Sequence, residues 1–205
     1  PEVDGLITNQ TAASGTAQLN SERLLIENIE ATHIGSNNGH VKLNGTWQHD
    51  NFAGDYAANP LDFAVSYERL MYSINDLNIS VIQGRSSIDG TLADYAFKNE
   101  LKLNINGHEE LRVDDLTASI NGTGSLTHVS ISQLQLDSDK LKLESDLQAG
   151  WQEALEIDLK ISSATTSLGL PDASESLQLQ GNIQLKDHQL NFSEFVTSLG
   201  ETRLT

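Results

Sequence analysis

The stretch LKLESDLQAGWQEALEIDLKIS, residues 141–162, carries an aliphatic residue at every second position in both of its halves. In an extended backbone, successive side chains point to opposite faces. Leu141 and Leu143 therefore share one face, while Lys142 and Glu144 take the other. The second half repeats the pattern with Leu155, Ile157, Leu159 and Ile161. The stretch predicts β-strands with one aliphatic and one solvated face.

The same alternation recurs along most of the chain. It is found at Ala17 and Leu19; Val41 and Leu43; Phe63, Val65 and Tyr67; Leu101, Leu103 and Ile105; Leu134 and Leu136; Leu177 and Leu179; Ile183 and Leu185. No segment of about 12 or more residues keeps the three-to-four period of a helix. The sequence therefore predicts an all-β chain with almost no helix.

Turn-forming pairs separate many of the alternating segments. Asp-Gly and Asn-Gly favour tight hairpin turns, because both residue types tolerate positive φ. The six pairs are Asp4-Gly5, Asn38-Gly39, Asn44-Gly45, Asp89-Gly90, Asn106-Gly107 and Asn121-Gly122. Asn44-Gly45 and Asp89-Gly90 are exceptions to this interpretation, because apolar residues flank them at strand spacing.

A loose pattern of apolar, polar, Gly, polar and apolar residues occurs at 43–47, 88–92 and 179–183. Its glycines, Gly45, Gly90 and Gly181, have the parity of the apolar residues and so lie on the aliphatic face. A position without a side chain lets a sheet bend or accept a bulge there. The glycines are about 45 and 91 residues apart, which suits repeats of about 45 residues. We predict an elongated, curved, groove-like sheet with a concave aliphatic face.

Composition argues against several classes of partner. The 205 residues include 12 Lys and Arg against 29 Asp and Glu, a net charge of −17. Nucleic acid and anionic membrane surfaces attract clustered cations, so neither is expected as a partner. The chain has no cysteine, which excludes disulfides and thiolate metal sites. It begins at Pro1 and ends within an alternating segment, so we expect one segment of a longer protein, 1–205, without an internal domain boundary.

The sequence contains no catalytic or cofactor-binding motif. The six histidines never fall in a metal-binding spacing, and no nucleophile elbow, phosphate-binding loop or dinucleotide fingerprint occurs. Paired carboxylates could act in a glycosidase-like site, but most of these acids lie at outward strand positions or in turns, where water keeps them ionised. We predict no catalytic, metal or cofactor-binding residues and no enzymatic activity.

The predicted aliphatic face has few rings, because aromatic residues number 11, or 5%. A closed core usually includes bulky rings, whereas a surface that accepts acyl chains can be uniformly aliphatic. A self-filled solenoid or sandwich of a surface or adhesin-like protein fits the composition as well. The expected lining residues are Leu43, Trp47, Leu101, Leu103, Ile105, Leu134, Leu136, Leu141, Leu143, Leu155, Ile157, Leu159, Ile161, Leu177, Leu179, Ile183 and Leu185.

The segment LEIDLKISSATTSLGLPDASESLQLQGNIQL, residues 155–185, resembles the TamB branch of the AsmA-like family, as do the LxGxW and IxGxL units. In that family, a strand, a short linker with LGLP and a Ser- and Leu-rich strand ending in LxGxI recur along a very long chain. The resemblance covers most of the 205 residues, as a general pattern of leucine-rich alternating strands. It implies a bridge anchored in the Gram-negative inner membrane that crosses the periplasm as a trough-shaped sheet.

The resemblance also implies partners and a role. Members contact an outer-membrane barrel protein, TamA for TamB itself, and are implicated in moving phospholipid to the outer membrane and in outer-membrane protein assembly. This chain shows neither the amino-terminal anchor of a full member nor a partner-binding end. The expectation is a non-enzymatic periplasmic segment whose groove binds or conducts phospholipid acyl chains, with membrane attachment through other segments.

Overall fold

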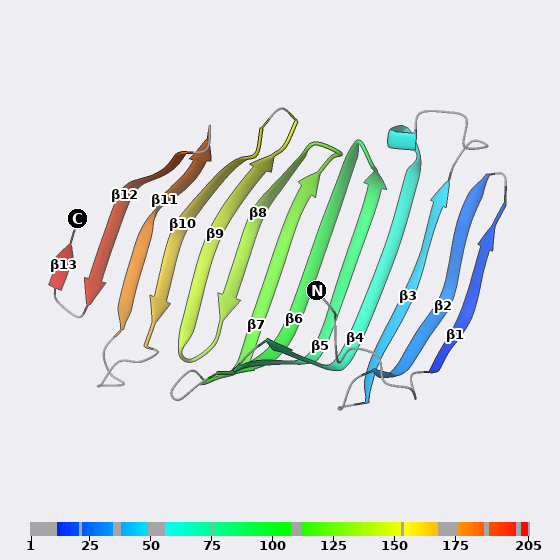
Figure 1. The fold of residues 1–205 in the computed structure, drawn as a ribbon, viewed down its shortest axis with the longest axis horizontal. Helices are drawn as coiled ribbons and strands as arrows, with labels where there is room; N and C mark the ends of the chain where they lie inside the picture. The colour runs from blue at the N-terminus through cyan, green and yellow to red at the C-terminus, as the bar shows by residue number, and fades with distance from the viewer. Residues whose placement is uncertain are drawn as a thin grey trace.

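The computed structural model describes residues 12–20, 22–34, 38–48, 56–74, 76–107, 112–152, 154–167, 176–186, 189–199 and 202–204. Thirteen strands form one sheet in which every strand pairs antiparallel with its neighbours in sequence (Figure 1). The strands are β1 (Ala12–Leu19), β2 (Arg23–Ile34), β3 (Gly39–Gln48), β4 (Pro60–Ile74), β5 (Leu77–Thr91), β6 (Asp94–Asn106), β7 (Arg112–Gly124), β8 (His128–Asp137), β9 (Leu141–Gly150), β10 (Glu156–Thr166), β11 (Leu177–Lys186), β12 (Gln189–Leu199) and β13 (Thr202–Leu204). The prediction of an all-β sheet is confirmed.

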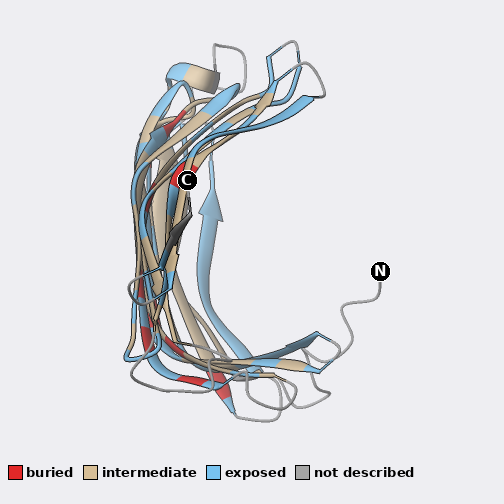
Figure 2. Cartoon of the chain, turned by 90° about the vertical axis from the view of Figure 1, so that its left-hand side faces the viewer, coloured by how far each residue is buried: buried red, intermediate tan, exposed pale blue. Residues whose placement is uncertain are grey.

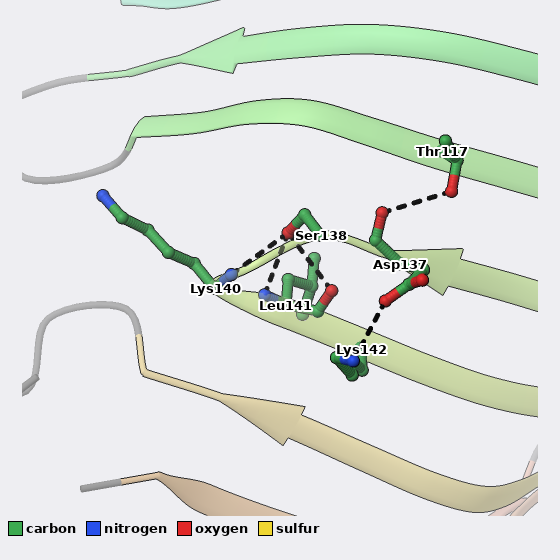
Figure 3. Close-up of polar contacts among 6 residues, drawn as sticks. All are labelled: Thr117, Asp137, Ser138, Lys140, Leu141 and Lys142. Carbon is green, nitrogen blue, oxygen red and sulfur yellow. Dashed lines mark hydrogen bonds and ion pairs between the residues drawn. The ribbon is translucent and has the colours of Figure 1, made fainter. Parts of the chain in front are cut away.

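Short connections keep the strands in sequence order. Between β8 and β9, the Ser138 hydroxyl accepts hydrogen bonds from the backbone N–H groups of Lys140 (3.3 Å) and Leu141 (3.0 Å), and it lies 3.2 Å from the Leu141 carbonyl oxygen, to which it can donate (Figure 3). The Ser138 N–H donates to the same carbonyl at 2.9 Å. Serine hydroxyls stabilise turns in this way. Next to the turn, Lys142 Nζ lies 3.3 Å from Asp137 Oδ1. The hairpin is therefore closed by local bonds and needs no Asn-Gly pair.

The sheet is strongly curved, and its profile is C-shaped when viewed along its long axis (Figure 2). Every buried residue of the described strands lies on one face, which also carries the alternating aliphatic residues: Gly39, Leu61, Gly84, Leu103, Val113, Leu116, Ala118, Gly124, Ser145 and Gly181. No second layer of described residues covers either face, so only curvature can bury side chains. The sheet therefore curves towards the aliphatic face, which is the concave one.

The densest packing lies where β6 and β7 bend. Leu103, Val113 and Leu116 are buried there, at 8%, 1% and 2% exposure. Partly buried neighbours surround them: Ile79, Val81, Leu101, Ile105 and Leu136. Contacts between adjacent strands of one layer thus replace the usual core between two layers.

The accessible surface is large for the mass of the chain. It measures 13394 Å², whereas a compact monomer of 22.3 kDa is expected to expose about 9400 Å². The excess agrees with a single-layer sheet that has two free faces. A solenoid or sandwich with a self-filled interior, the alternative architecture considered from the sequence, is therefore not what the described residues form.

Bulges accompany the curvature. Asn28 and Asp115 have positive φ, 49° and 52°, and each lies at a register shift between strands. The backbone N–H of Asn28 donates to Asn44 Oδ1 at 2.9 Å, and that of Asp115 donates to Asn104 Oδ1 at 2.8 Å. An extra residue on one strand bends the sheet, and an asparagine across the pair satisfies the amide that the ladder loses.

Several local expectations need correction. Asn121-Gly122, predicted as a turn, lies inside β7, as Asn44-Gly45 and Asp89-Gly90 lie inside β3 and β5. Asn38 is in a turn, as predicted, and Asp4-Gly5 falls outside the described residues. The described helical structure is one 3₁₀ turn, Tyr56–Ala58. Asn121 and Gly122 remain extended because both neighbouring strands pair with them.

Candidate functional site

The concave face is built of four rows of side chains that run across the strands, along the long axis of the trough. Residues directly opposite each other in an antiparallel pair point to the same face. The first row is Leu24, Trp47, Leu61, Gly90, Tyr95, Gly124, Val129, Ala149, Ile157, Leu185 and Leu190. The second row is Ile26, Gly45, Phe63, Ile88, Phe97, Gly122, Ile131, Leu147, Leu159, Ile183 and Phe192.

Two further rows lie beside them on this face. The third row is Ile29, Leu43, Val65, Ser86, Asn99, Ile120, Leu134, Ser145, Ile161 and Gly181. The fourth row is Ala31, Val41, Tyr67, Gly84, Leu101, Ala118, Leu136, Leu143, Ala164, Leu179 and Thr197. The first and second rows contain no polar residue other than Tyr95 and Trp47. At about 4.8 Å per strand, ten steps give an apolar path of about 48 Å.

The structure places nearly all of the expected lining residues on this face. Twelve belong to the four rows: Leu43, Trp47, Leu101, Leu134, Leu136, Leu143, Ile157, Leu159, Ile161, Leu179, Ile183 and Leu185. Leu103 and Ile105 continue the face of β6 into the bend, and Thr166 pairs with both Leu141 and Leu177 beyond the fourth row. Leu155 is different, because it precedes β10 and is 52% exposed. It lies in the β9–β10 connection, outside the sheet.

The three glycines of the sequence pattern, Gly45, Gly90 and Gly181, lie on the concave face in three different rows. Gly181 has a φ of +155° and is opposite register shifts on both sides, in β10 and β12. Gly45 lies under the ring of Phe63, where a Cβ atom would overlap that ring. We propose that the sheet bends at these three glycines.

Sequence reasoning left part of the lining out. Phe63, Ile88, Phe97, Ile131 and Leu147 fill the centre of the second row. Most of them alternate with polar residues, but the sequence around each one does not show that strand pairing brings them into one row. Three polar residues were missed for a different reason. Ser86, Asn99 and Ser145 interrupt the aliphatic period, yet strand pairing puts all three in the third row.

The polar residues of the third row differ in their bonding. The hydroxyls of Tyr67 and Ser86 both donate to Asn99 Oδ1, at 2.8 Å and 3.1 Å, and the two hydroxyl oxygens lie 3.0 Å apart. Ser145 is 4% exposed, and its Oγ has no hydrogen-bond partner among the described residues. The concave face thus contains one bonded polar cluster and one buried, unpaired hydroxyl.

Charged residues occupy the opposite, convex face. Lys42 pairs with Glu30 (3.1 Å), Lys98 with Glu100 (2.8 Å) and Lys102 with Asp115 (2.7 Å). The hydrogen bond from Lys98, with its charge, holds the pKa of the Glu100 carboxyl below its usual range. By contrast, the register-paired positions of the concave face include no Asp, Glu, Lys or Arg in the described strands. A shallow hollow between Lys42, Arg85 and Lys98 belongs to the convex face.

The described part of the chain offers little sign of any other kind of site. Within it, no group of three or more His, Asp or Glu residues is arranged to hold a metal ion. Nor does any helix there have the length and apolar character that a membrane span requires. The concave face is therefore the candidate site.

Comparison with known proteins identifies the family. Residues 55–194, which are 140 of the 205, match the family model described as TamB, N-terminal domain. The chain belongs to this family. No curated protein and no solved structure matches it. The match confirms the resemblance seen in the sequence, and it spans most of the concave face of this TamB-family chain, from β4 to most of β12.

Membership of the TamB family indicates a general role. The TamB family acts in membrane-associated transport or assembly, as a membrane-anchored periplasmic bridge. It is a family of transport and assembly components.

Proposed function

We propose that this chain is a non-enzymatic segment of an inner-to-outer membrane bridge, and that its concave face binds and conducts phospholipid acyl chains. The observation that carries the proposal is the pair of continuous apolar rows, the first and the second, on a face that no described residue covers. An aliphatic surface of this extent requires an apolar partner. In an open trough, hydrocarbon tails can be that partner.

The energetics of tail binding are favourable without a specific site. At about 0.8 kcal/mol for each buried CH₂ group, a chain of some 16 carbons would gain roughly 10 kcal/mol before ordering costs. Travel along the trough requires similar energies at successive positions. The second row offers an aliphatic, aromatic or glycine position on each of eleven consecutive strands, which supports movement without deep traps.

The partners and location follow from the same proposal. The chain is one periplasmic segment of a longer protein, attached to the inner membrane through other segments. It contributes to lipid transport towards the outer membrane and to outer-membrane protein assembly. A TamA-like outer-membrane barrel is the proposed protein partner, in line with the association of the family with outer-membrane assembly machinery.

Adjacent residues of β11 provide a matched test. Leu179 is half-buried on the concave face, and Gln178 is exposed on the convex face. Leu179→Asp and Gln178→Asp add the same charge one residue apart. We expect phospholipid to co-purify with the parent and with Gln178→Asp, and to be lost from Leu179→Asp, when lipid extracts are compared by mass spectrometry.

Circular dichroism confirms that both variants keep the β-sheet, so that lost lipid is not lost fold. The proposal is wrong if folded Leu179→Asp retains as much phospholipid as the parent. It is also wrong if the parent carries none and takes up none from added vesicles of phosphatidylethanolamine and phosphatidylglycerol.

A further inference from the structure

The cluster of Tyr67, Ser86 and Asn99 is polar, yet it lies within the aliphatic lining. Asn99 and Ser86 are direct partners in the third row, and Tyr67 is in the adjacent fourth row. Their row neighbours are Val65 on one side and Ile120 on the other. All three side chains are partly buried, so their polar atoms are partly withdrawn from water.

A count of donors shows what the cluster lacks. The protons of both hydroxyls are used within the cluster, on Asn99 Oδ1 or on the other hydroxyl oxygen. The two protons on Asn99 Nδ2 have no hydrogen-bond partner within the described part of the chain. Asn99 Nδ2 is not among the fully buried atoms without a partner, so water can accept from it in the open trough. A ligand that covers the cluster displaces that water and has to supply an acceptor oxygen in its place.

The surroundings define the kind of oxygen. The register-paired positions of this face carry no cation, so a carboxylate or phosphate brought against Asn99 would lose water without gaining a counter-charge. A neutral carbonyl accepts the amide protons without that penalty. It must also carry an apolar chain, because Phe97 and Leu101 flank Asn99 along β6. An ester carbonyl at the head of an acyl chain has both properties.

We propose that Asn99 donates a hydrogen bond to the ester carbonyl of a glycerolipid whose tails lie along the aliphatic rows, and that Tyr67 and Ser86 hold its amide in position. This inference rests on the proposed function, and it adds a preferred stopping point to an otherwise uniform lining. Lipids with ester-linked chains are held there more tightly than lipids whose chains carry no carbonyl.

The test uses short-chain, water-soluble lipids that differ only in the linkage. Dihexanoyl phosphatidylcholine has two ester carbonyls, and its dihexyl ether analogue has none. With the 205-residue chain, we expect the ester lipid to bind about two- to tenfold more tightly, the range for one net hydrogen bond. The side-chain amide resonances of Asn99, followed by ¹⁵N NMR, should shift with the ester lipid and stay in place with the ether lipid.

Two substitutions complete the test. Asn99→Leu removes the donor but leaves the hydroxyls of Tyr67 and Ser86 close enough to bond each other, so the preference for ester over ether should disappear while both lipids still bind. Ile120→Leu, next in the row, should keep the preference. Equal affinity of the parent for both lipids, with unmoved Asn99 amide resonances, overturns this inference and leaves the acyl-chain proposal standing. Failure of both lipids to bind overturns both.

Discussion

The ring of Tyr67 on β4 covers Gly84 on β5, its direct partner in the fourth row. A Cβ atom at residue 84 would overlap Tyr67 Cε2 and lie 2.8 Å from Leu101 Cδ2. The same arrangement recurs on this face, with rings of Phe97 and Tyr95 over Gly122 and Gly124. Aromatic rings placed over glycines on a neighbouring strand fill the inside of a curved sheet, where room is shortest.

Gly84→Ala should destabilise the sheet. The methyl group has no free space beneath the Tyr67 ring, so the ring or the strand must move, at a cost of about 1–3 kcal/mol. Urea unfolding measured by circular dichroism reports the change in the free energy of unfolding. Gly150→Ala is the matched control, because the nearest atom to its Cβ position is Thr127 O at 3.9 Å. That variant should be neutral or slightly more stable.

The contact itself can be tested by a double-mutant cycle. Tyr67→Ala removes the ring, so the additional Gly84→Ala change should then cost much less than it costs in the parent. Equal costs with and without the ring would show that the destabilisation comes from the backbone and not from the aromatic contact.

Within a stretch of strand free of bulges, local alternation alone puts residues on one face, because successive side chains point to opposite sides. Ile157, Leu159 and Ile161 needed no knowledge of their partners. The residue at which a strand begins or ends depends more on contacts with other parts of the chain. Leu155 continues the alternation of Ile157, but β10 begins only at Glu156. Leu155 belongs to the connection after β9, in which Trp151 donates its backbone N–H to Thr127 O and its indole N–H to Leu126 O.

The roles of glycines and polar residues depended on strand pairing and could not be predicted. Gly84 is explained by Tyr67, 17 residues earlier, and Gly122 by Phe97, 25 residues earlier. Asn99 is a single break in an aliphatic period until pairing places Ser86 beside it. The sequence indicates which face a glycine or a polar residue occupies, whereas the residue opposite it on the next strand determines which contact it makes.

The bulge at Asp115 depends on the side chain of Asn104. Asn104→Ala leaves the backbone N–H of Asp115 without its acceptor at a positive-φ position, which should cost about 1–2 kcal/mol in the free energy of unfolding. Asn104→Asp keeps an acceptor oxygen and should retain most of the stability. Asn106→Ala, on the same strand and exposed, should change the urea midpoint little. An equal loss from Asn104→Asp and Asn104→Ala would contradict the role given to the acceptor.

Removal of the Lys98 ammonium should raise the pKa of Glu100. The hydrogen bond and charge of Lys98 hold that pKa below its usual range, so Lys98→Met should return it towards the ordinary carboxyl value. A pH titration of the Glu100 carboxyl carbon by NMR measures the shift. Lys142→Met, which removes the partner of Asp137, should leave the Glu100 titration unchanged.

The sign of the linked stability effect follows from the direction of the shift. A carboxyl whose pKa is lower in the folded state stabilises the fold above its unfolded-state pKa, and this contribution is lost as the pH falls through the folded-state pKa. The parent should therefore be more stable than Lys98→Met at neutral pH. The difference should vanish in strong acid, and a difference that persisted there would point to packing of the lysine stem instead of charge.

Two serines of the third row should respond in opposite ways to alanine. The Ser145 hydroxyl is buried without a partner, so Ser145→Ala removes an unsatisfied polar group and should stabilise the sheet by about 1 kcal/mol. The Ser86 hydroxyl is bonded to Asn99 Oδ1, so Ser86→Ala should destabilise it by about 1 kcal/mol. The two changes remove the same atom from the same face of one sheet, and urea midpoints compare them directly. If Ser145→Ala is instead the more destabilising, its hydroxyl has a partner in solution, and an ordered water or a bound ligand atom at that position of the trough would be the group to look for.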